Sequence, residues 1–180
     1  MTPIRFVTGN KHKSGHVSHY LAQAGIEMIP CHHQSQELQT EHLDQLIHDK
    51  VLQAFELLGR PVFVEYTALY MNAIDNFPAG LTHILWEKLQ LDNFARVLGN
   101  LGDSGVRARS MIGYCDSRNI FTFEGSLQGN ILSEPQGERT NSWDCIFIPE
   151  GQNQPLSQLV DFQGARQQAL KKLCNFLHGR

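Results

Sequence analysis

The chain has 180 residues, of which 41% are hydrophobic and 18% charged, and its formal net charge is −3 at pH 7. This length suffices for one domain with a core that needs neither a metal ion nor disulfides. The small negative charge excludes bulk electrostatic binding to nucleic acid or to an anionic membrane, so a phosphate ligand must be bound locally. No apolar run approaches the roughly 20 residues of a membrane span. The N-terminus also lacks a signal-peptide pattern, so we expect a cytoplasmic protein.

The N-terminal residues predict a strand followed by a helix. Residues 4–7 favour a short strand, and residues 8–10, Thr-Gly-Asn, are typical of the turn that ends one. Apolar residues then recur at helical spacing over residues 17–24, and Gly25 is placed to end this helix. We therefore expect the helix to pack on a sheet through its apolar side.

A second helix and a buried strand are predicted next. The helix is expected to begin at Thr40, as its N-cap, and to end at Gly59. The apolar run at residues 61–64 predicts a buried strand that stops at Glu65-Tyr66-Thr67. Side chains at the end of such a strand commonly reach a cleft.

The C-terminal half changes from helical to strand periodicity. After a loop-rich stretch, two short helices are predicted, and then two long strands joined by a turn. A last strand and a closing helix complete a mixed α/β domain with a long antiparallel hairpin, and such folds commonly carry a cleft beside the sheet. The helices are expected at residues 82–89 and 92–98, the hairpin strands at 106–115 and 120–131, the last strand at 143–148, and the core face of the closing helix at Ala169, Leu170, Leu173 and Leu177.

The stretch FVTGNKHK, residues 6–13, has the composition of a local anion site. A flexible glycine and Asn10 lie between a strand and a helix start, where backbone N–H groups attract anions, and Lys11 and Lys13 add two ammonium groups. An ordinary strand-to-helix turn with solvated lysines explains the same pattern. The stretch is not a Walker A loop, because G-x-x-x-x-G-K-[ST] is absent.

Lys50 is the second indication of a phosphate site. It falls inside the apolar arc of its helix, where a cation is costly unless its side chain snorkels to water or meets an anion. Snorkelling is the commoner explanation of such a position. A lysine that faced the same cleft as Lys11 and Lys13 would instead supply a third positive group for a polyphosphate.

The sequence contains one pair of carboxylates that could hold a metal ion, together with residues that only look like ligands. Glu37 and Glu65 come from separate segments, and Mg²⁺ uses one or two carboxylates with waters and substrate phosphates. Each glutamate taken alone is more often a solvated surface charge. His12, His16 and His19 lie opposite the apolar side of their helix, which favours surface residues over metal ligands. The four cysteines form no C-x-x-C pair, which favours reduced thiols over a zinc site or disulfides.

Several segments, in order along nearly the whole chain, are similar to one known family. They are FVTGNKHK, QELQ around Glu37, Lys50 in its helix, VFVEYTAL, FPAG, FEGSLQGNI, SWDCIFIPEG and ARQQAL. In these segments the chain resembles the Ham1 family of inosine triphosphate pyrophosphatases. The resemblance implies a single Ham1-like domain over residues 1–180, with an elongated, two-lobed ITPase-like (anticodon-binding or Maf-like) architecture around a central cleft. It also implies a homodimer that hydrolyses non-standard purine nucleoside triphosphates, such as ITP, dITP and XTP, to a nucleoside monophosphate and pyrophosphate.

The same resemblance implies roles for individual residues. Mg²⁺ would be the cofactor, held by Glu37 and Glu65, and Glu65 and Lys50 would be catalytic. The partner would be a nucleoside triphosphate, without nucleic acid or membrane. The implied substrate ligands are Thr8, Asn10, Lys11 and Lys13 at the phosphate end, and Trp143, Asp144 and Arg166 at the base end.

The chain departs from the family pattern at both ends of the implied site. Family members typically carry an aspartate where this chain has Tyr66, and a phenol with an ordinary pKa of about 10 cannot replace it at neutral pH. The aromatic residue expected to stack on the base is Asn141, and the Ser-His-Arg motif reads Gly164-Ala165-Arg166. Two hypotheses follow. The first is a divergent nucleoside triphosphate pyrophosphatase, and the second is a catalytically silent relative that acts as a nucleotide-binding sensor or accessory protein.

Overall fold

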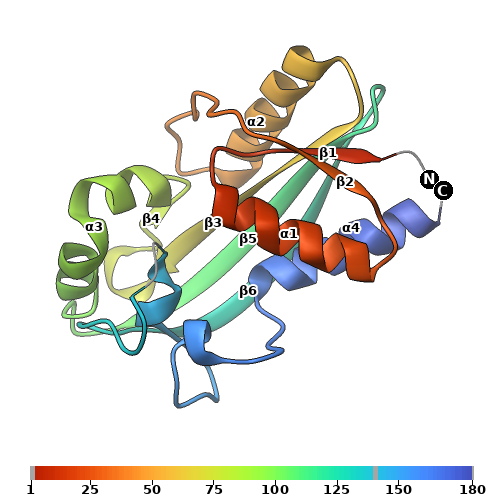
Figure 1. Ribbon diagram of the computed structural model, residues 1–180. Coiled ribbons are helices and arrows are strands. Elements are labelled where there is room, and N and C mark those ends of the chain that lie inside the picture. The colour runs from red at the N-terminus through yellow and green to blue at the C-terminus, as the bar shows by residue number, and fades with distance from the viewer. Residues whose placement is uncertain (1–2, 140–141, 180) are drawn as a thin grey trace.

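One mixed β-sheet with helices on both faces forms the framework of the protein (Figure 1). The structure is a computed structural model that describes residues 3–139 and 142–179. Within these residues the strand order is β2-β1-β3-β5-β6-β7, and the short β4 pairs with β3. The strands are β1 (Ile4–Val7), β2 (Met28–Cys31), β3 (Val62–Met71), β4 (Pro78–Ala79), β5 (Gly105–Cys115), β6 (Ile120–Ile131) and β7 (Phe147–Pro149).

Helix α2 (Leu43–Leu58) covers one face of the sheet, and α1 (Lys11–Gln23) and α4 (Ala165–His178) cover the other (Figure 1). Helix α3 (Thr82–Leu98) lies at one end of the sheet. No helix in the described ranges is both long and apolar enough to span a membrane. These layers of helices on both faces of a mixed sheet confirm the mixed α/β fold predicted from the sequence.

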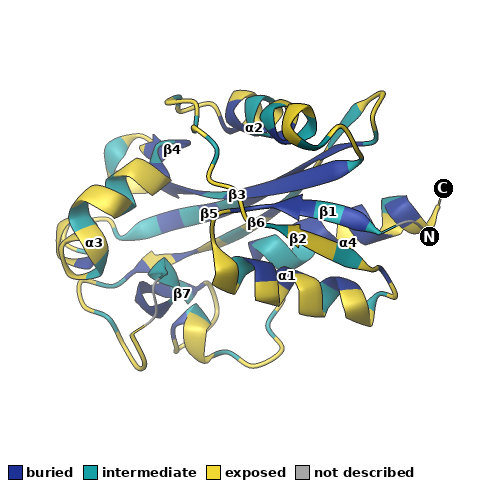
Figure 2. Cartoon of the chain, turned by 45° about the horizontal axis from the view of Figure 1, so that its top comes forward, coloured by how far each residue is buried: buried dark blue, intermediate teal, exposed yellow. Residues whose placement is uncertain are grey.

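Strand β3 separates the core into two sides because its side chains alternate between the two faces. Val62 and Val64 pack in the cluster under α2, whereas Phe63 packs in the cluster under α1 and α4. Figure 2 shows the buried strands between helices whose outer surfaces are exposed. The core face predicted for the closing helix is also confirmed, since its four predicted residues are all buried: Ala169, Leu170, Leu173 and Leu177.

The predicted hairpin is present as β5 and β6, which pair from Gly105 opposite Asn130 to Cys115 opposite Ile120. Strands β2 and β4 were not predicted from the sequence. β2 contains Pro30 and has no fully buried residue, so it carries no alternating apolar pattern. β4 has only two residues, too few for any periodicity.

The strand after α2 is longer than the sequence predicts. β3 does not stop at Glu65 but continues to Met71, and all ten of its residues pair with β5. The polar residues at 65 and 67 suggested a strand end because polar side chains usually leave a core. In the fold, Glu65 stays inside because Lys13 and Ser110 supply it with partners.

Three other boundaries can be compared with the predictions. Thr40 is not the N-cap of α2, which begins at Leu43, because the Thr40 hydroxyl accepts the backbone N–H of His42 instead. Residues 143–146 form a 3₁₀ helix, so most of the predicted last strand is absent and β7 begins only at Phe147. The two short helices predicted within residues 82–98 are both present, because Gln90 breaks the helical path of α3 with a φ of 57°.

The strand pairing along one edge of β3 is interrupted, and the candidate site lies at this interruption. β1 pairs with β3 at residues 62 and 63, and β4 pairs with it only at residues 69 and 70. Between them, residues 64–68 have β5 on one side and, within the described ranges, no strand on the other. We call residues 64–68 the notch. Because neighbouring side chains of a strand point to opposite faces, helices on both faces can reach the notch.

Gly125 of β6 marks a close contact between α4 and the sheet, and its substitution tests this packing. A Cβ added to Gly125 would lie 2.0 Å from the backbone oxygen of Ala165. Gly125→Ala should therefore lower the free energy of unfolding, measured in urea, by about 1–3 kcal/mol. The matched control is Gly15→Ala in α1, where the added Cβ meets nothing within 4 Å. Alanine should stabilise that helix by about 0.5–1 kcal/mol, and equal effects of the two substitutions would contradict the packing.

Candidate functional site

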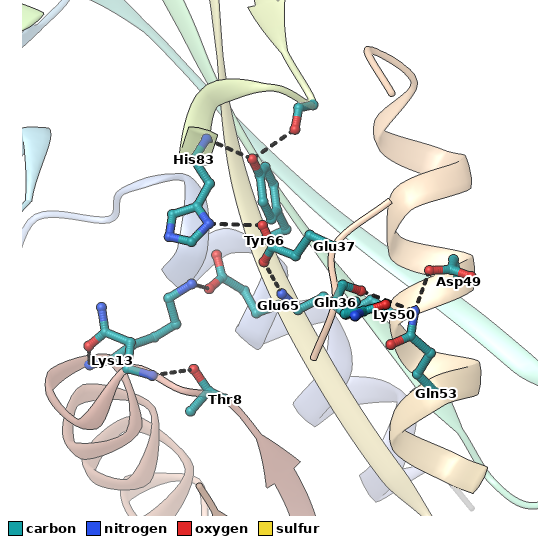
Figure 3. A network of polar contacts seen from close by, with 12 residues as sticks. Thr8, Lys13, Gln36, Glu37, Asp49, Lys50, Gln53, Glu65, Tyr66 and His83 are labelled. Atoms are coloured by element: carbon teal, nitrogen blue, oxygen red, sulfur yellow. Dashed lines mark hydrogen bonds and ion pairs between the residues drawn. The ribbon is translucent and has the colours of Figure 1, made fainter. Parts of the chain in front are cut away.

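Two clusters of charged and polar side chains meet at the notch, one on each face of the sheet (Figure 3). Together they join four helices and two strands with the loop before α2. The Glu65 cluster, on the face of α1 and α4, consists of Lys13, Glu65, Thr67, Ser110 and Arg166. The Glu37 cluster, on the face of α2, consists of Glu37, Lys50, Tyr66 and His83.

Glu65 is the centre of the first cluster. Its side chain is 1% exposed, and its Oε2 lies 2.7 Å from the Nζ of Lys13. Its Oε1 accepts hydrogen bonds from the hydroxyls of Thr67 at 2.6 Å and Ser110 at 2.8 Å, and the Nε of Arg166 lies 3.5 Å away. A buried carboxylate needs such partners because an unpaired charge in the interior is costly. Glu65 thus holds an ammonium and a guanidinium at the notch.

The turn after β1 directs Lys13 toward Glu65. Asn10 is the N-cap of α1, and its Oδ1 accepts the backbone N–H of Lys13 at 2.9 Å. The hydroxyl of Thr8 accepts the backbone N–H of Asn10 at 3.1 Å. Thr8 and Asn10 therefore fix the start of α1 beside the notch, while their direct contact with a phosphate stays a prediction.

Glu37 is the centre of the second cluster and lies in the loop between β2 and α2. Its Oε1 forms an ion pair with Lys50, and its Oε2 lies 2.9 Å from the Nδ1 of His83. The Lys50 side chain is only 14% exposed. Of the two explanations open for Lys50, snorkelling and a buried anion, the structure therefore supports the anion.

Tyr66 is a structural residue of the Glu37 cluster. It is 4% exposed, and its hydroxyl donates to the backbone oxygen of Gly80 at 2.8 Å and accepts the backbone N–H of His83 at 2.9 Å. Burial raises the pKa of the phenol above its ordinary value. Tyr66 is therefore neutral at physiological pH and ties the start of α3 to β3.

Both glutamates are ionised at neutral pH. Burial by itself would raise the pKa of Glu37, but the hydrogen bond from His83 and the charge of Lys50 outweigh it and lower the pKa to about 2. In the same way, the charges of Lys13 and Arg166 outweigh burial and hold the pKa of Glu65 well below its ordinary value. The hydrogen bond to Glu37 in turn raises the pKa of His83. The two clusters are therefore networks of charged groups.

The structure gathers some, not all, of the residues predicted for the phosphate end. Lys13, Lys50 and both glutamates meet at the notch. Lys11 is exposed at the first position of α1 and, among the described residues, has no ion pair or hydrogen bond with either cluster. Arg166, which the family resemblance assigns to the base end, lies with its Nε 3.5 Å from Oε1 of Glu65, and its contact with a base stays a prediction.

The residues predicted for the base end lie further along the sheet. Trp143 packs edge-on against Phe147, with ring centroids 5.4 Å apart, in an apolar cluster that includes Leu69 and Met71. These two residues of β3 share the face of Glu65, because all three are odd-numbered. Trp143 and the adjacent Asp144 therefore lie over the same face as the Glu65 cluster. Asn141 lies outside the described residues.

Sequence reasoning missed His83, Thr67 and Ser110. Ser110 and Thr67 are paired across β5 and β3, and a polar residue inside a strand pattern was an available signal for each. For His83 the sequence carries no local signal, since its partner Glu37 is 46 positions away. The surface positions predicted for the histidines at 12, 16 and 19 are confirmed, and the four cysteines form no disulfide in the structure.

The donor set at the notch does not fit a metal ion held by the protein. In residues 3–139 and 142–179, no three side chains of His, Cys, Asp or Glu converge as metal ligands. The oxygens of Glu37 and Glu65 face lysine, histidine or hydroxyl donors. The aspartate position of the family pattern is occupied by the neutral Tyr66. The Mg²⁺ cofactor stays a prediction, and no catalytic step is assigned to it below.

The chain is similar to Ham1 proteins and to proteins named as nucleoside triphosphate pyrophosphatases. The Ham1 family profile matches residues 4–176. A dITP/XTP pyrophosphatase from Methanopyrus kandleri is 30% identical over 157 residues, 87% of this chain and 84% of the relative. An inosine triphosphate pyrophosphatase from Yarrowia lipolytica is 29% identical over 186 residues, 97% of this chain and 95% of the relative. The solved structure of a HAM1 protein from Coxiella burnetii matches with a TM-score of 0.83 at 20% identity, covering 100% of both chains, which confirms the fold.

The ion pairs of Glu37 predict how stability depends on pH. Because its pKa is lower in the folded protein than in the unfolded chain, ionised Glu37 stabilises the fold above about pH 4.5, and this contribution is lost as the pH falls toward 2. Glu37→Gln should therefore reduce the loss of stability between about pH 6 and pH 3. Urea unfolding at each pH measures this loss. Glu56→Gln, an exposed position of α2, is the matched control, and a wild-type pH profile for Glu37→Gln would contradict the assignment.

Proposed function

This chain belongs to the Ham1 family, and from that premise we propose that it hydrolyses non-standard purine nucleoside triphosphates to nucleoside monophosphates and pyrophosphate. The similar proteins named dITP/XTP pyrophosphatase and inosine triphosphate pyrophosphatase support this substrate class. A shared fold does not by itself determine function, so the proposal also depends on the residues at the notch.

The observation that carries the proposal is the meeting of Lys13 and Lys50 at the notch. They come from helices on opposite faces of the sheet, and each pairs with a carboxylate, Lys13 with the buried Glu65 and Lys50 with the partly buried Glu37 (Figure 3). Arg166 adds a guanidinium from α4. Three basic side chains around one interrupted strand edge suit a chain of phosphates, because each non-bridging oxygen can accept a charge-assisted hydrogen bond.

The reaction follows from this charge arrangement. The oxygen of a water molecule forms a bond to the α-phosphorus and its proton passes to the solvent, while the bond from that phosphorus to the oxygen bridging to the β-phosphate breaks and pyrophosphate leaves with its electron pair. Lys13, Lys50 and Arg166 align the phosphates and stabilise the negative charge that develops on the leaving group. Fixed cations are effective here because they need no reorganisation during the reaction.

Of the two glutamates, Glu37 is placed to act on the attacking water. Its carboxylate is ionised and its side chain is 18% exposed, so beside Lys50 and His83 its oxygens keep a lone pair that can accept a hydrogen bond from water. Glu65 is 1% exposed and surrounded by protein donors. We therefore assign Glu65 to positioning Lys13 and Arg166. Trp143 and Asp144 are assigned to the base, as the family resemblance implies.

The assembly and location of the protein are part of the proposal. The family resemblance supports a homodimer that works in the cytoplasm. Light scattering after gel filtration measures the assembly, and the expected mass is twice the 20.4 kDa of one chain. A mass of 20.4 kDa at all concentrations would contradict the dimer.

Pyrophosphate release tests the activity. The purified protein should release pyrophosphate from dITP and XTP faster than from the standard purine triphosphates. Lys50→Gln should lower kcat/KM for dITP by about 10²-fold or more, because it removes a cation that stabilises the transition state. Lys171→Gln, at an exposed position of α4, is the matched control and should leave kcat/KM unchanged.

The outcomes separate the hypotheses stated from the sequence. Turnover of any triphosphate excludes the catalytically silent relative. Nucleotide binding without turnover supports a nucleotide-binding sensor or accessory protein instead. If the protein neither turns over nor binds any triphosphate, the proposed function is wrong.

A further inference from the structure

We propose that this site binds the triphosphate directly through Lys13, Lys50 and Arg166 and does not coordinate a divalent metal ion. The inference rests on the proposed function, because it concerns the form in which the nucleotide is bound. The chemistry of the described side chains at the notch is the basis for this assignment of the ligand, a triphosphate bound without a metal ion held by the protein.

The first reason is that Glu65 has no oxygen available to a metal. Its Oε2 faces the Lys13 ammonium at 2.7 Å, and its Oε1 accepts two hydroxyl hydrogen bonds. The side chain is 1% exposed. Mg²⁺ retains several of its waters and requires near-octahedral geometry, so it would have to displace the ammonium and open this buried cluster. The structure instead uses Glu65 to hold cations.

The second reason is that Glu37 is occupied in the same way from the other face. Lys50 pairs with one of its oxygens, and the imidazole of His83 lies 2.9 Å from the other. The backbone N–H of His83 is itself fixed by the Tyr66 hydroxyl. An imidazole and an ammonium therefore stand at the two oxygens where a metal ion would bind.

The third reason is the residue between the two glutamates. At position 66, where the family pattern has an acidic residue, the chain has a buried phenol whose hydroxyl donates to Gly80. Burial keeps this phenol neutral, so it offers no anionic oxygen. Among the described residues no group of three metal-ligating side chains exists elsewhere either.

The charge balance gives the positive part of the inference. Two carboxylates stand against three basic side chains, Lys13, Lys50 and Arg166, so basic groups outnumber acidic ones in this cluster. Like charges repel strongly at short range in a partly buried site, which disfavours a divalent cation and favours a polyanion. A triphosphate free of metal carries more negative charge than its Mg²⁺ complex. It should therefore bind at least as tightly as the complex.

The test is to measure binding of one probe with and without metal. The probe is the non-hydrolysable α,β-imido analogue of dITP, titrated into wild-type protein by calorimetry in excess EDTA and in saturating MgCl₂. The expected dissociation constant in EDTA is equal to or lower than that in MgCl₂. A value in EDTA that is higher by about tenfold or more would overturn the inference, because it would show that metal contributes to binding.

A second titration uses the metal alone. MgCl₂ and MnCl₂ added to the nucleotide-free wild-type protein should produce no binding heat and no change in melting temperature. If either ion binds saturably to the wild type and Glu37→Gln abolishes this binding, the carboxylate of Glu37 is available to a metal ion and the inference is contradicted. Proteins that bind a ligand only when folded are stabilised by it, so the melting temperature is an independent readout.

Tyr66→Asp tests position 66, where the chain has no side chain that could bind a metal ion, and Tyr66→Phe is the matched control. The aspartate restores an anionic oxygen between the clusters, so probe binding to this variant should become at least about tenfold tighter in MgCl₂ than in EDTA. Tyr66→Phe adds no ligand and should keep the metal independence of the wild type. Circular dichroism and melting curves show whether each variant folds. Metal-independent binding by folded Tyr66→Asp would contradict the role given to Tyr66.

The outcomes distinguish this inference from the proposed function. Binding of the probe only in MgCl₂ overturns the inference and leaves pyrophosphate hydrolysis intact. Lack of probe binding in both conditions overturns the inference together with the proposed function. Equal or tighter binding in EDTA supports the inference, and pyrophosphate release from dITP and XTP then decides whether the protein hydrolyses what it binds.

Discussion

A buried carboxylate beside an interrupted strand edge is the constraint on which the site depends. The exposed edge of a strand leaves backbone groups unpaired and is normally covered. Here β1 and β4 cover the two ends of the β3 edge and leave the notch between them. Glu65 lies inside the notch, where an ionised side chain persists only with compensating partners. Its pairing with Lys13 and Arg166 therefore fixes the starts of α1 and α4 at one place.

A phosphate ligand also requires cationic side chains that are already fixed in position. Lysine side chains lose considerable rotational freedom when they bind a ligand, and a lysine already ordered by a carboxylate has lost that freedom on folding. Lys13 and Lys50 are both ordered in this way, from opposite faces of the sheet. The same ion pairs occupy the carboxylates that a metal would need. The same contacts therefore stabilise the fold and decide whether the nucleotide is bound with or without a metal ion.

Position 66 shows how one substitution changes a network. Where the family pattern has an acidic residue, Tyr66 fills apolar space under α2 and joins β3 to Gly80 and to the start of α3. This connection places His83 against Glu37. Tyr66 therefore contributes packing and the position of another side chain, and contributes no charge.

The sequence by itself determined what depends on short-range patterns. These are the β5–β6 hairpin, the core face of α4, the break near Gln90 and the anion-site composition before α1. Only the tertiary structure decided that β3 continues past Glu65, that Arg166 lies against Glu65, and that His83 contacts Glu37. The physical reason is that periodicity and capping act within a few residues, whereas a buried charge is stabilised by whichever partners the fold brings to it from distant parts of the chain.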